Sequence, residues 1–110
     1  MKLPDMKFKK IDWLDIPKTD FPGEKGAGHS HTDEEGDLRT RVVTYEPGFV
    51  LDHYCQRGHI VYVLEGEFII DLADGRIFTF QPGSGLAVSD GGDSPHRIRS
   101  VTGCRVFIAD

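Results

Sequence analysis

Long apolar runs, cysteine and an excess of positive charge are all scarce in this 110-residue sequence. No apolar run approaches the ~18 residues that a membrane-spanning helix needs, so no transmembrane segment is expected. Two cysteines, Cys55 and Cys104, are too few for a disulfide framework, and in a reducing compartment they are expected to remain thiols. The net charge of −5 comes without a dense positive stripe, which argues against a nucleic-acid partner.

Signals for secretion and for long helices are missing as well. Met1-Lys2-Leu3-Pro4 is not followed by an apolar segment of the kind that secretory signals carry, so the expected location is the cytoplasm, with no membrane partner. Pro4, Pro17 and Pro22 argue against a long helix near the N-terminus. The apolar fraction of 38% and the charged fraction of 28% are those of an ordinary globular protein, and the length suits one domain.

What the sequence does contain is a series of short β-type segments separated by turn residues. Glu46-Pro47-Gly48 is typical of a turn, and Asp74-Gly75 is typical of a tight hairpin. Evenly spaced strands without helices predict an all-β barrel or sandwich, and two antiparallel sheets in a jelly roll also protect exposed edges. Residues 1–37 are expected to form an N-terminal arm and loop, and residues 38–110 the barrel. The expected strands are 38–45, 49–55, 59–64, 68–72, 76–80, 86–89, 96–101 and 104–109.

The stretch from Gly48 to Glu67 carries the residues with the most chemistry. As two strands joined by a turn at 56–58, it would place His53 and Cys55 on one face and His59 on the facing strand, because alternate side chains of a strand share a face. His96 follows Ser94-Pro95 further along. Imidazole and thiolate are metal ligands, so this pattern predicts a metal site. The competing interpretation makes these residues hydrogen-bonded core histidines and an inert small hydrophobe.

The same residues resemble the two motifs of the cupins. The first cupin motif is Gly, His-x-His, Glu and Gly in a fixed frame, and Gly48, His53-Tyr54-Cys55, His59 and Gly66 fit it. The second is a turn rich in proline and glycine that leads to one more histidine, here Gln81-Pro82-Gly83 and Ser94-Pro95-His96. The resemblance spans about residues 38–108 and is finest to the small DHCW-motif cupin-fold proteins, although this chain reads Asp52-His53-Tyr54-Cys55. It implies a cupin-type jelly-roll β-barrel.

The chain departs from the cupin pattern at three positions. Cys55 stands at the second histidine, His59 at the glutamate, and Ser100 near the place of the expected asparagine. The resemblance therefore implies His53, His59 and His96 as metal ligands, with Cys55 as a fourth candidate that could equally be a hydrophobe of the pocket wall.

Other candidate residues lie before this frame. His29-Ser30-His31 is another His-x-His pair, but acidic, flexible residues surround it, which favours a solvated loop or a short edge strand. Arg39 and Arg41 alternate along the strand at 38–45. They would hold an acidic ligand if they pointed inward, and they would be surface charges if they pointed outward. Phe8, Ile11 and Trp13 form an apolar arm that covers either its own barrel or a neighbouring subunit.

These residues leave two function classes open. One is a metal-dependent enzyme, an oxygenase, isomerase or hydrolytic enzyme, acting on a small organic acid. The other is a non-catalytic cupin that binds or senses a metal or a small molecule. A divalent zinc, iron, nickel or manganese ion held by neutral imidazoles keeps the site positive, so the expected ligand is anionic. Tyr45, Tyr54 and Tyr62 are candidate acid–base partners, although strand alternation turns the last two away from the histidines. A homodimer is expected, because the edge strands of a small barrel need covering.

Overall fold

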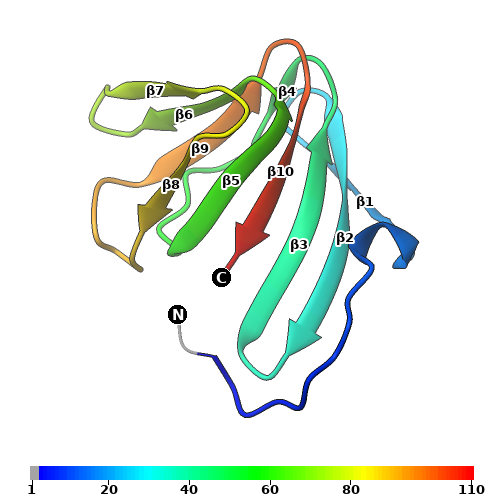
Figure 1. Cartoon of the computed structure of the whole chain (residues 1–110). Helices are drawn as coiled ribbons and strands as arrows, with labels where there is room; N and C mark the ends of the chain where they lie inside the picture. The colour runs from blue at the N-terminus through cyan, green and yellow to red at the C-terminus, as the bar shows by residue number, and fades with distance from the viewer. Residues whose placement is uncertain (1–2) are drawn as a thin grey trace.

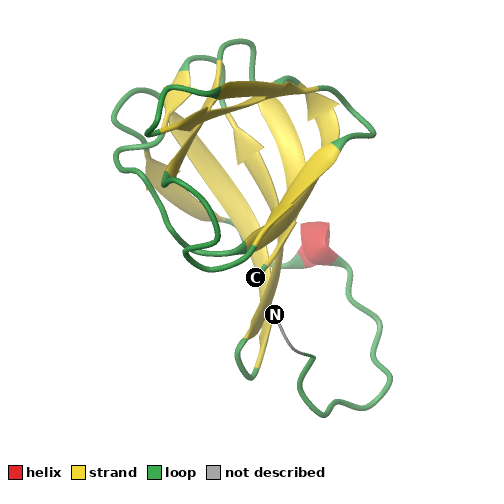
Figure 2. Ribbon diagram, turned by 90° about the vertical axis from the view of Figure 1, so that its left-hand side faces the viewer, coloured by secondary structure: helices red, strands yellow, loops and turns green. Residues whose placement is uncertain are grey.

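The computed structural model describes residues 3–110, which form ten β-strands and one short 3-10 helix arranged as two facing sheets. The six-stranded sheet has the order β1-β2-β3-β10-β5-β8, and the four-stranded sheet has the order β4-β9-β6-β7. Figure 1 labels the strands, and Figure 2 shows the sheets curving toward each other around a common interior. The elements are η1 (Trp13–Asp15), β1 (Thr19–Pro22), β2 (Ala27–Glu35), β3 (Leu38–Tyr45), β4 (Phe49–Val50), β5 (His59–Gly66), β6 (Phe68–Leu72), β7 (Ile77–Phe80), β8 (Gly85–Val88), β9 (His96–Ser100) and β10 (Cys104–Ala109).

The core lies between the two sheets and follows from the two-residue period of the strands. Every second side chain of β3, β5 and β10 meets the inward side chains of β6 and β9. Phe49 and Phe68 are fully buried, and each contributes about 1.5–3 kcal/mol through removal of apolar surface from water. The all-β prediction of two antiparallel sheets is confirmed. The buried core residues are Val43, Tyr45, Phe49, Val61, Val63, Phe68, Ile70, Ile98, Cys104, Val106 and Ile108.

The predicted strand over 49–55 is wrong beyond Val50. β4 has two residues and pairs with β9, not with the strand that begins at His59. Asp52 accepts a hydrogen bond from His53 Nδ1 at 2.7 Å, and local side-chain bonds of this kind compete with a strand ladder. Asp is also disfavoured in strands. Residues 51–58 therefore form a loop between the sheets, with one antiparallel bridge between Cys55 and His96.

Besides the hairpin with its turn at 56–58, the sequence predicts a hairpin at Asp74-Gly75 and another that joins segments 96–101 and 104–109 across Thr102-Gly103, and of these two only the first is present. β6 pairs with β7 around Asp74-Gly75 as predicted. Asp-Gly pairs favour a type I′ turn, which needs positive φ at both central residues. Gly75 has φ of 99°, but no residue other than glycine has positive φ among residues 3–110, so the turn is of another type. The other hairpin is wrong, because β9 and β10 lie in different sheets and Thr102-Gly103 connects one sheet to the other.

The segment before Leu38 is more ordered than the expected arm and loop. β1 and β2 extend the six-stranded sheet, and the nine-residue β2 pairs with β3 along its whole length. Trp13 packs edge-on against Phe107 with ring centroids 5.3 Å apart, and its Nε1 donates to the Thr40 carbonyl at 3.2 Å. Trp13 thus packs on the outer surface of its own barrel, whereas Phe8 is fully exposed. None of the helical residues in the described part of the chain forms a helix long and apolar enough to cross a membrane.

Candidate metal centre

One end of the barrel interior gathers a thiol and two imidazoles. His59 is the first residue of β5 and His96 the first of β9, so each sheet provides one histidine. Cys55 reaches them from the β4–β5 loop, where its backbone N–H donates to the His96 carbonyl at 2.7 Å and its carbonyl accepts from the His96 N–H at 2.9 Å. The ligand atoms of the three side chains lie within 4.8 Å of one another. This cluster could hold a metal ion.

His96 carries the clearest sign of a missing partner. Its side chain is buried, with 6% of its surface exposed. Within residues 3–110, its Nε2 is one of the buried side-chain atoms that find no hydrogen-bond partner. A buried polar atom without a partner is costly in a protein interior. A cation beside Nε2 removes that cost, and the Cys55 and His59 side chains complete a donor set that suits a transition metal.

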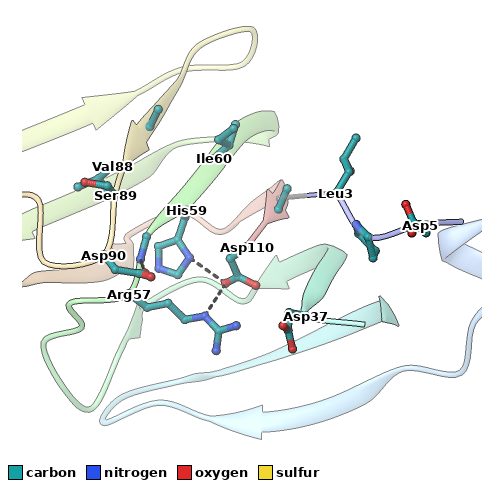
Figure 3. Close-up of a pocket in the computed structure, with 14 residues that line it drawn as sticks. Leu3, Asp5, Asp37, Arg57, His59, Ile60, Val88, Ser89, Asp90 and Asp110 are labelled. Carbon is teal, nitrogen blue, oxygen red and sulfur yellow. Dashed lines mark hydrogen bonds and ion pairs between the residues drawn. The ribbon is translucent and has the colours of Figure 1, made fainter. Parts of the chain in front are cut away.

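His59 is held in place by the carboxylate of Asp110, a residue that the sequence motifs do not predict. Its Nδ1 forms a hydrogen bond with Asp110 Oδ2 at 2.9 Å, drawn in Figure 3. This contact leaves Nε2 as the atom available to a ligand. Histidines that bind metals almost always use their other ring nitrogen in this way, since the contact fixes both the tautomer and the ring orientation. The arrangement therefore fits a metal-binding role for His59.

The loop geometry before His59 depends on Gly58. Its backbone N–H donates to Asp90 Oδ1, and a Cβ added at this position would lie 2.7 Å from the Asp90 backbone nitrogen. Because real Cβ atoms do not approach a neighbouring backbone so closely, only glycine allows the two loops to pack here. This close packing sets where β5 begins and so where His59 enters the barrel.

Asp110 is also the centre of a charge cluster. Its side chain is 1% exposed and binds Arg39 through two contacts, Nε–Oδ1 at 2.9 Å and Nη2–Oδ2 at 3.0 Å. Arg41 adds an Nη2–Oδ2 contact at 3.1 Å, and Nε of the more exposed Arg57 lies 3.6 Å from Oδ2. Burial alone would raise the pKa of Asp110, but Arg39, Arg41 and His59 outweigh it and hold that pKa well below its usual range. The carboxylate is therefore ionised.

Arg39 and Arg41 point into the barrel. Arg41 is paired with Ile108, and it shares a face of β3 with the buried Val43 and Tyr45. Of the two directions that the sequence left open, the inward one is correct. Arg39 uses both Nε and Nη2 to bind Asp110, whereas Arg41 donates to it only through Nη2, and the buried Nε of Arg41 finds no hydrogen-bond partner among the described residues. Their use in holding an acidic ligand stays a prediction.

The protonation of the two histidines also suits a metal. Burial lowers the pKa of His59, with Arg41 and Arg57 acting in the same direction and Asp110 against it. Burial lowers the pKa of His96 too, and the neighbouring His59 adds to the effect. Neutral imidazole is the form that binds metal ions, so the burial of both histidines favours the protonation state in which they can coordinate a metal.

The structure does not bring His53 to this cluster. Its side chain is 63% exposed and pairs with its neighbour Asp52. Because β4 ends at Val50, the alternation that would have turned His53 inward does not continue to it. Its place beside His59 and His96 is taken by Cys55, two residues further on.

The other His-x-His pair lies on β2, away from the cluster. His29 and His31 face the same side with ring centroids 5.7 Å apart. His31 Nδ1 contacts the Ile16 carbonyl at 2.5 Å, which ties this strand to the segment after η1. Over residues 3–110 the pair belongs to no group of three metal-type side chains within reach of one ion. The solvated loop or short edge strand expected for this segment is wrong, because β2 has nine residues and lies between β1 and β3.

A pocket of about 290 Å³ adjoins His96. It lies where the edge strands β7 and β8 of the two sheets face each other, and it is mostly apolar. Tyr45 is buried in the core, whereas Tyr54 and Tyr62 are 43% and 50% exposed, and none of the three lines this pocket. The residues that form its wall next to His96 are Ile70, Leu72, Phe78, Phe80 and Leu86.

The two facing antiparallel sheets, with a cluster of polar side chains at one end of the interior, have the fold of the cupins. The polyketide cyclase RemF from Streptomyces resistomycificus is similar, with a TM-score of 0.72 and 21% identity over 94% of this chain and 78% of that one. Ectoine synthase from P. lautus is also similar, with a TM-score of 0.65 and 22% identity over 94% of this chain and 76% of that one. A cupin-2 domain protein from Shewanella frigidimarina has a TM-score of 0.59 and 21% identity over 74% of this chain and 78% of that one. No protein-family model and no curated sequence matches this chain.

Proposed function

We propose that this protein is a small metal-dependent enzyme of the cupin fold. Cys55, His59 and His96 hold a divalent transition metal, and a small organic acid binds beside it. Two observations carry the proposal: the ligand atoms of Cys55, His59 and His96 lie within 4.8 Å of one another, and the buried Nε2 of His96 finds no hydrogen-bond partner among the described residues. Two proteins of similar fold are named as enzymes, which shows only that this fold accommodates catalysis.

The donor set narrows the choice of metal. Thiolate is a soft ligand and imidazole suits zinc, iron and nickel, whereas manganese prefers oxygen ligands. Three protein ligands leave at least one position for water or substrate, as catalytic zinc sites do. A bound ion would polarise a carbonyl or lower the pKa of a bound water. With one thiolate and two neutral imidazoles, a divalent ion leaves the site with a charge of about +1, which favours an anionic head group on the ligand.

Elemental analysis of protein purified without an affinity tag tests this proposal directly. Zinc, iron or nickel near one equivalent per chain is expected, and zinc added to chelator-treated protein should restore the same ratio. Protein that carries no metal and binds none of the three ions on titration would refute it.

Cys55 supplies a prediction of its own. Replacing Cys55 with serine should lower zinc affinity by roughly 10- to 100-fold, because the serine hydroxyl keeps the volume but is a much weaker zinc ligand than the thiolate. In cobalt-substituted protein, the sulfur-to-metal charge-transfer absorption should disappear with it. Cys104→Ala is the matched control, since Cys104 is buried in the core and belongs to no metal cluster. A cobalt spectrum unchanged by Cys55→Ser would remove Cys55 from the site.

A second function, metal or ligand binding without turnover, is favoured by one observation. The two ionisable side chains that line the pocket besides His96 are Arg76 and Asp93, and they pair with each other. Asp110 is committed to Arg39, Arg41 and His59. The described residues thus offer no uncommitted carboxylate or tyrosine as a general base at the pocket. Recovery of a bound metabolite chemically unchanged after long incubation would favour this function over the enzyme.

We further propose that two copies of the chain pair through the outer face of β5. Ile60, Tyr62 and Leu64 alternate along this face and are 49%, 50% and 41% exposed. Tyr62 is the cross-strand neighbour of Phe107, which packs on Trp13, so the apolar strip continues onto the arm. A twofold dimer would bury the same strip on both copies.

Tyr62→Glu should therefore weaken dimerisation at least about tenfold, because it places a charge in the centre of the strip. Sedimentation at micromolar concentration measures the change. Ile77→Glu is the control, since Ile77 is also exposed but lies on the other sheet. A parent protein that sediments only as a 12.3 kDa species would refute the dimer.

A further inference from the structure

The pocket beside His96 lies at the seam where the barrel is least closed. β7 is the edge of the four-stranded sheet and β8 the edge of the six-stranded sheet. In Figure 1 the β6–β7 hairpin lies above β8 at the left of the molecule. Because the two edges do not pair with each other, no hydrogen-bonded ladder closes the space between them. The volume of about 290 Å³ is roughly twice that of a cavity of ~150 Å³ that holds one benzene molecule.

The wall of this pocket contains two aromatic rings in a nearly parallel pair. Phe78 and Phe80 have ring centroids 6.4 Å apart and planes 24° from parallel. Phe80 packs onward against the buried Phe68, so the inner ring is fixed by the core. Phe78 is 46% exposed. Its ring therefore offers uncovered surface beside the pocket, and flat aromatic partners stack on such rings in offset or edge-on geometry.

Among the described residues, the one cationic side chain that lines this pocket besides His96 is Arg76, and it is already paired. Arg76 Nη2 lies 2.8 Å from Asp74 Oδ2 and 2.5 Å from Asp93 Oδ1, so one guanidinium pairs with two carboxylates. Arg39 and Arg41, the other candidates for an acid, are bound to Asp110 and do not line this pocket. A negatively charged group on a ligand would thus meet an uncommitted polar side chain only at the end of the pocket where His96 lies.

We propose that the pocket binds a ligand that has one aromatic ring, or two fused aromatic rings, and carries an ionisable oxygen. The rings lie among Phe78, Phe80 and Leu86, and the oxygen points to the His96 end. The inference deepens the proposed function and rests on it, since the oxygen faces the metal there. Phenols and aromatic carboxylic acids are the ligand class that this combination selects.

Isothermal titration of zinc-loaded protein with 2-naphthoate tests the inference, with acetate and decahydro-2-naphthoate as comparison ligands. All three carry the same carboxylate, and the last has the same carbon skeleton without aromatic rings. We expect 2-naphthoate to bind at least about tenfold more tightly than acetate and about threefold more tightly than the saturated acid.

Two variants on one strand locate the binding. Phe78→Ala should weaken 2-naphthoate binding at least about fivefold through the loss of ring contact. Ile77→Ala is the matched control, because Ile77 is the adjacent residue of β7, is 61% exposed and does not line the pocket. It should leave the affinity unchanged. Zinc titration of both variants should match the parent protein, which shows that the metal site and the fold are intact.

The outcomes separate this inference from the proposed function. If zinc binds but 2-naphthoate binds no more tightly than acetate or the saturated acid, the ligand class is wrong and the metal site stands. Equal loss in the Phe78 and Ile77 variants also overturns it. If no metal binds, while metal-free protein takes 2-naphthoate with the expected Phe78 dependence, the aromatic pocket is supported and the proposed function fails.

Discussion

His59→Ala is expected to lower zinc affinity by roughly 100-fold or more, while the barrel stays folded. Second-shell residues alone change metal affinity by about 10- to 100-fold, and loss of a direct ligand should exceed that. The side chain sits at the open end of the interior, so little core packing goes with it. Competition titration against a zinc chelator gives the affinity, and far-ultraviolet circular dichroism reports the fold.

His53→Ala is the matched control for this experiment. It removes the same side chain six residues earlier in the chain, but His53 is exposed and lies outside the cluster. Its zinc affinity should equal that of the parent. Tight zinc binding by the His59 variant would show that the site is assigned wrongly, and a loss with His53→Ala would show that surface histidines bind the ion.

The difference between these two histidines shows what sequence can and cannot locate. Strand positions after residue 59 are predicted within a few residues, because glycine and proline turns bound segments of β-branched and aromatic residues. Which strands pair is not encoded locally. β10 pairs with β3 and with β5 across more than thirty intervening residues, and β9 joins the other sheet. The prediction that His53 and His59 face each other assumed a local hairpin between their two segments. It is wrong because β4 ends at Val50 and pairs with β9 instead.

The site itself was predictable in part. His59 and His96 begin strands, so period-two alternation correctly turns both inward, next to Val61 and Ile98. Cys55 could not be placed from alternation, since it lies in a loop and is oriented by one bridge to His96. Asp110 was missed, although a signal existed. It continues the inward series of β10 that runs through Val106 and Ile108, and an acid in an inward position requires a cationic partner.

Asp110 combines two tasks that are separable by experiment. It orients His59 through the Nδ1 contact, and it neutralises the guanidiniums that β3 sends into the barrel. The protein carries a net charge of −5, yet this end of the interior holds Arg39, Arg41 and Arg57 around a single carboxylate. The local charge is therefore positive. Removing the one anion should affect both the metal site and the stability of the fold.

Asp110→Ala is expected to lower the free energy of unfolding by about 3 kcal/mol. Breaking a buried ion pair costs about 3–5 kcal/mol because the remaining charge is stranded, and the partial exposure of Arg39 and Arg41, 29% and 20%, keeps the loss near the lower end. Urea denaturation of metal-free protein measures it. Asp20→Ala is the control: its pair with Lys18 is exposed on both sides, 57% for Lys18 and 77% for Asp20, and such pairs contribute about 1 kcal/mol or less.

A double variant then identifies the cause. If the loss comes from stranded charge, Arg41→Leu in the Asp110→Ala background should restore part of the stability, because it removes a buried cation that has lost its partner. If the loss comes from missing side-chain volume, the second substitution should leave it unchanged or deepen it. Zinc affinity should stay about 10- to 100-fold below that of the parent in both variants, since neither regains the contact that orients His59. Recovery of stability without recovery of zinc affinity would show that Asp110 performs two distinct tasks, and simultaneous recovery of both would refute its role in orienting His59.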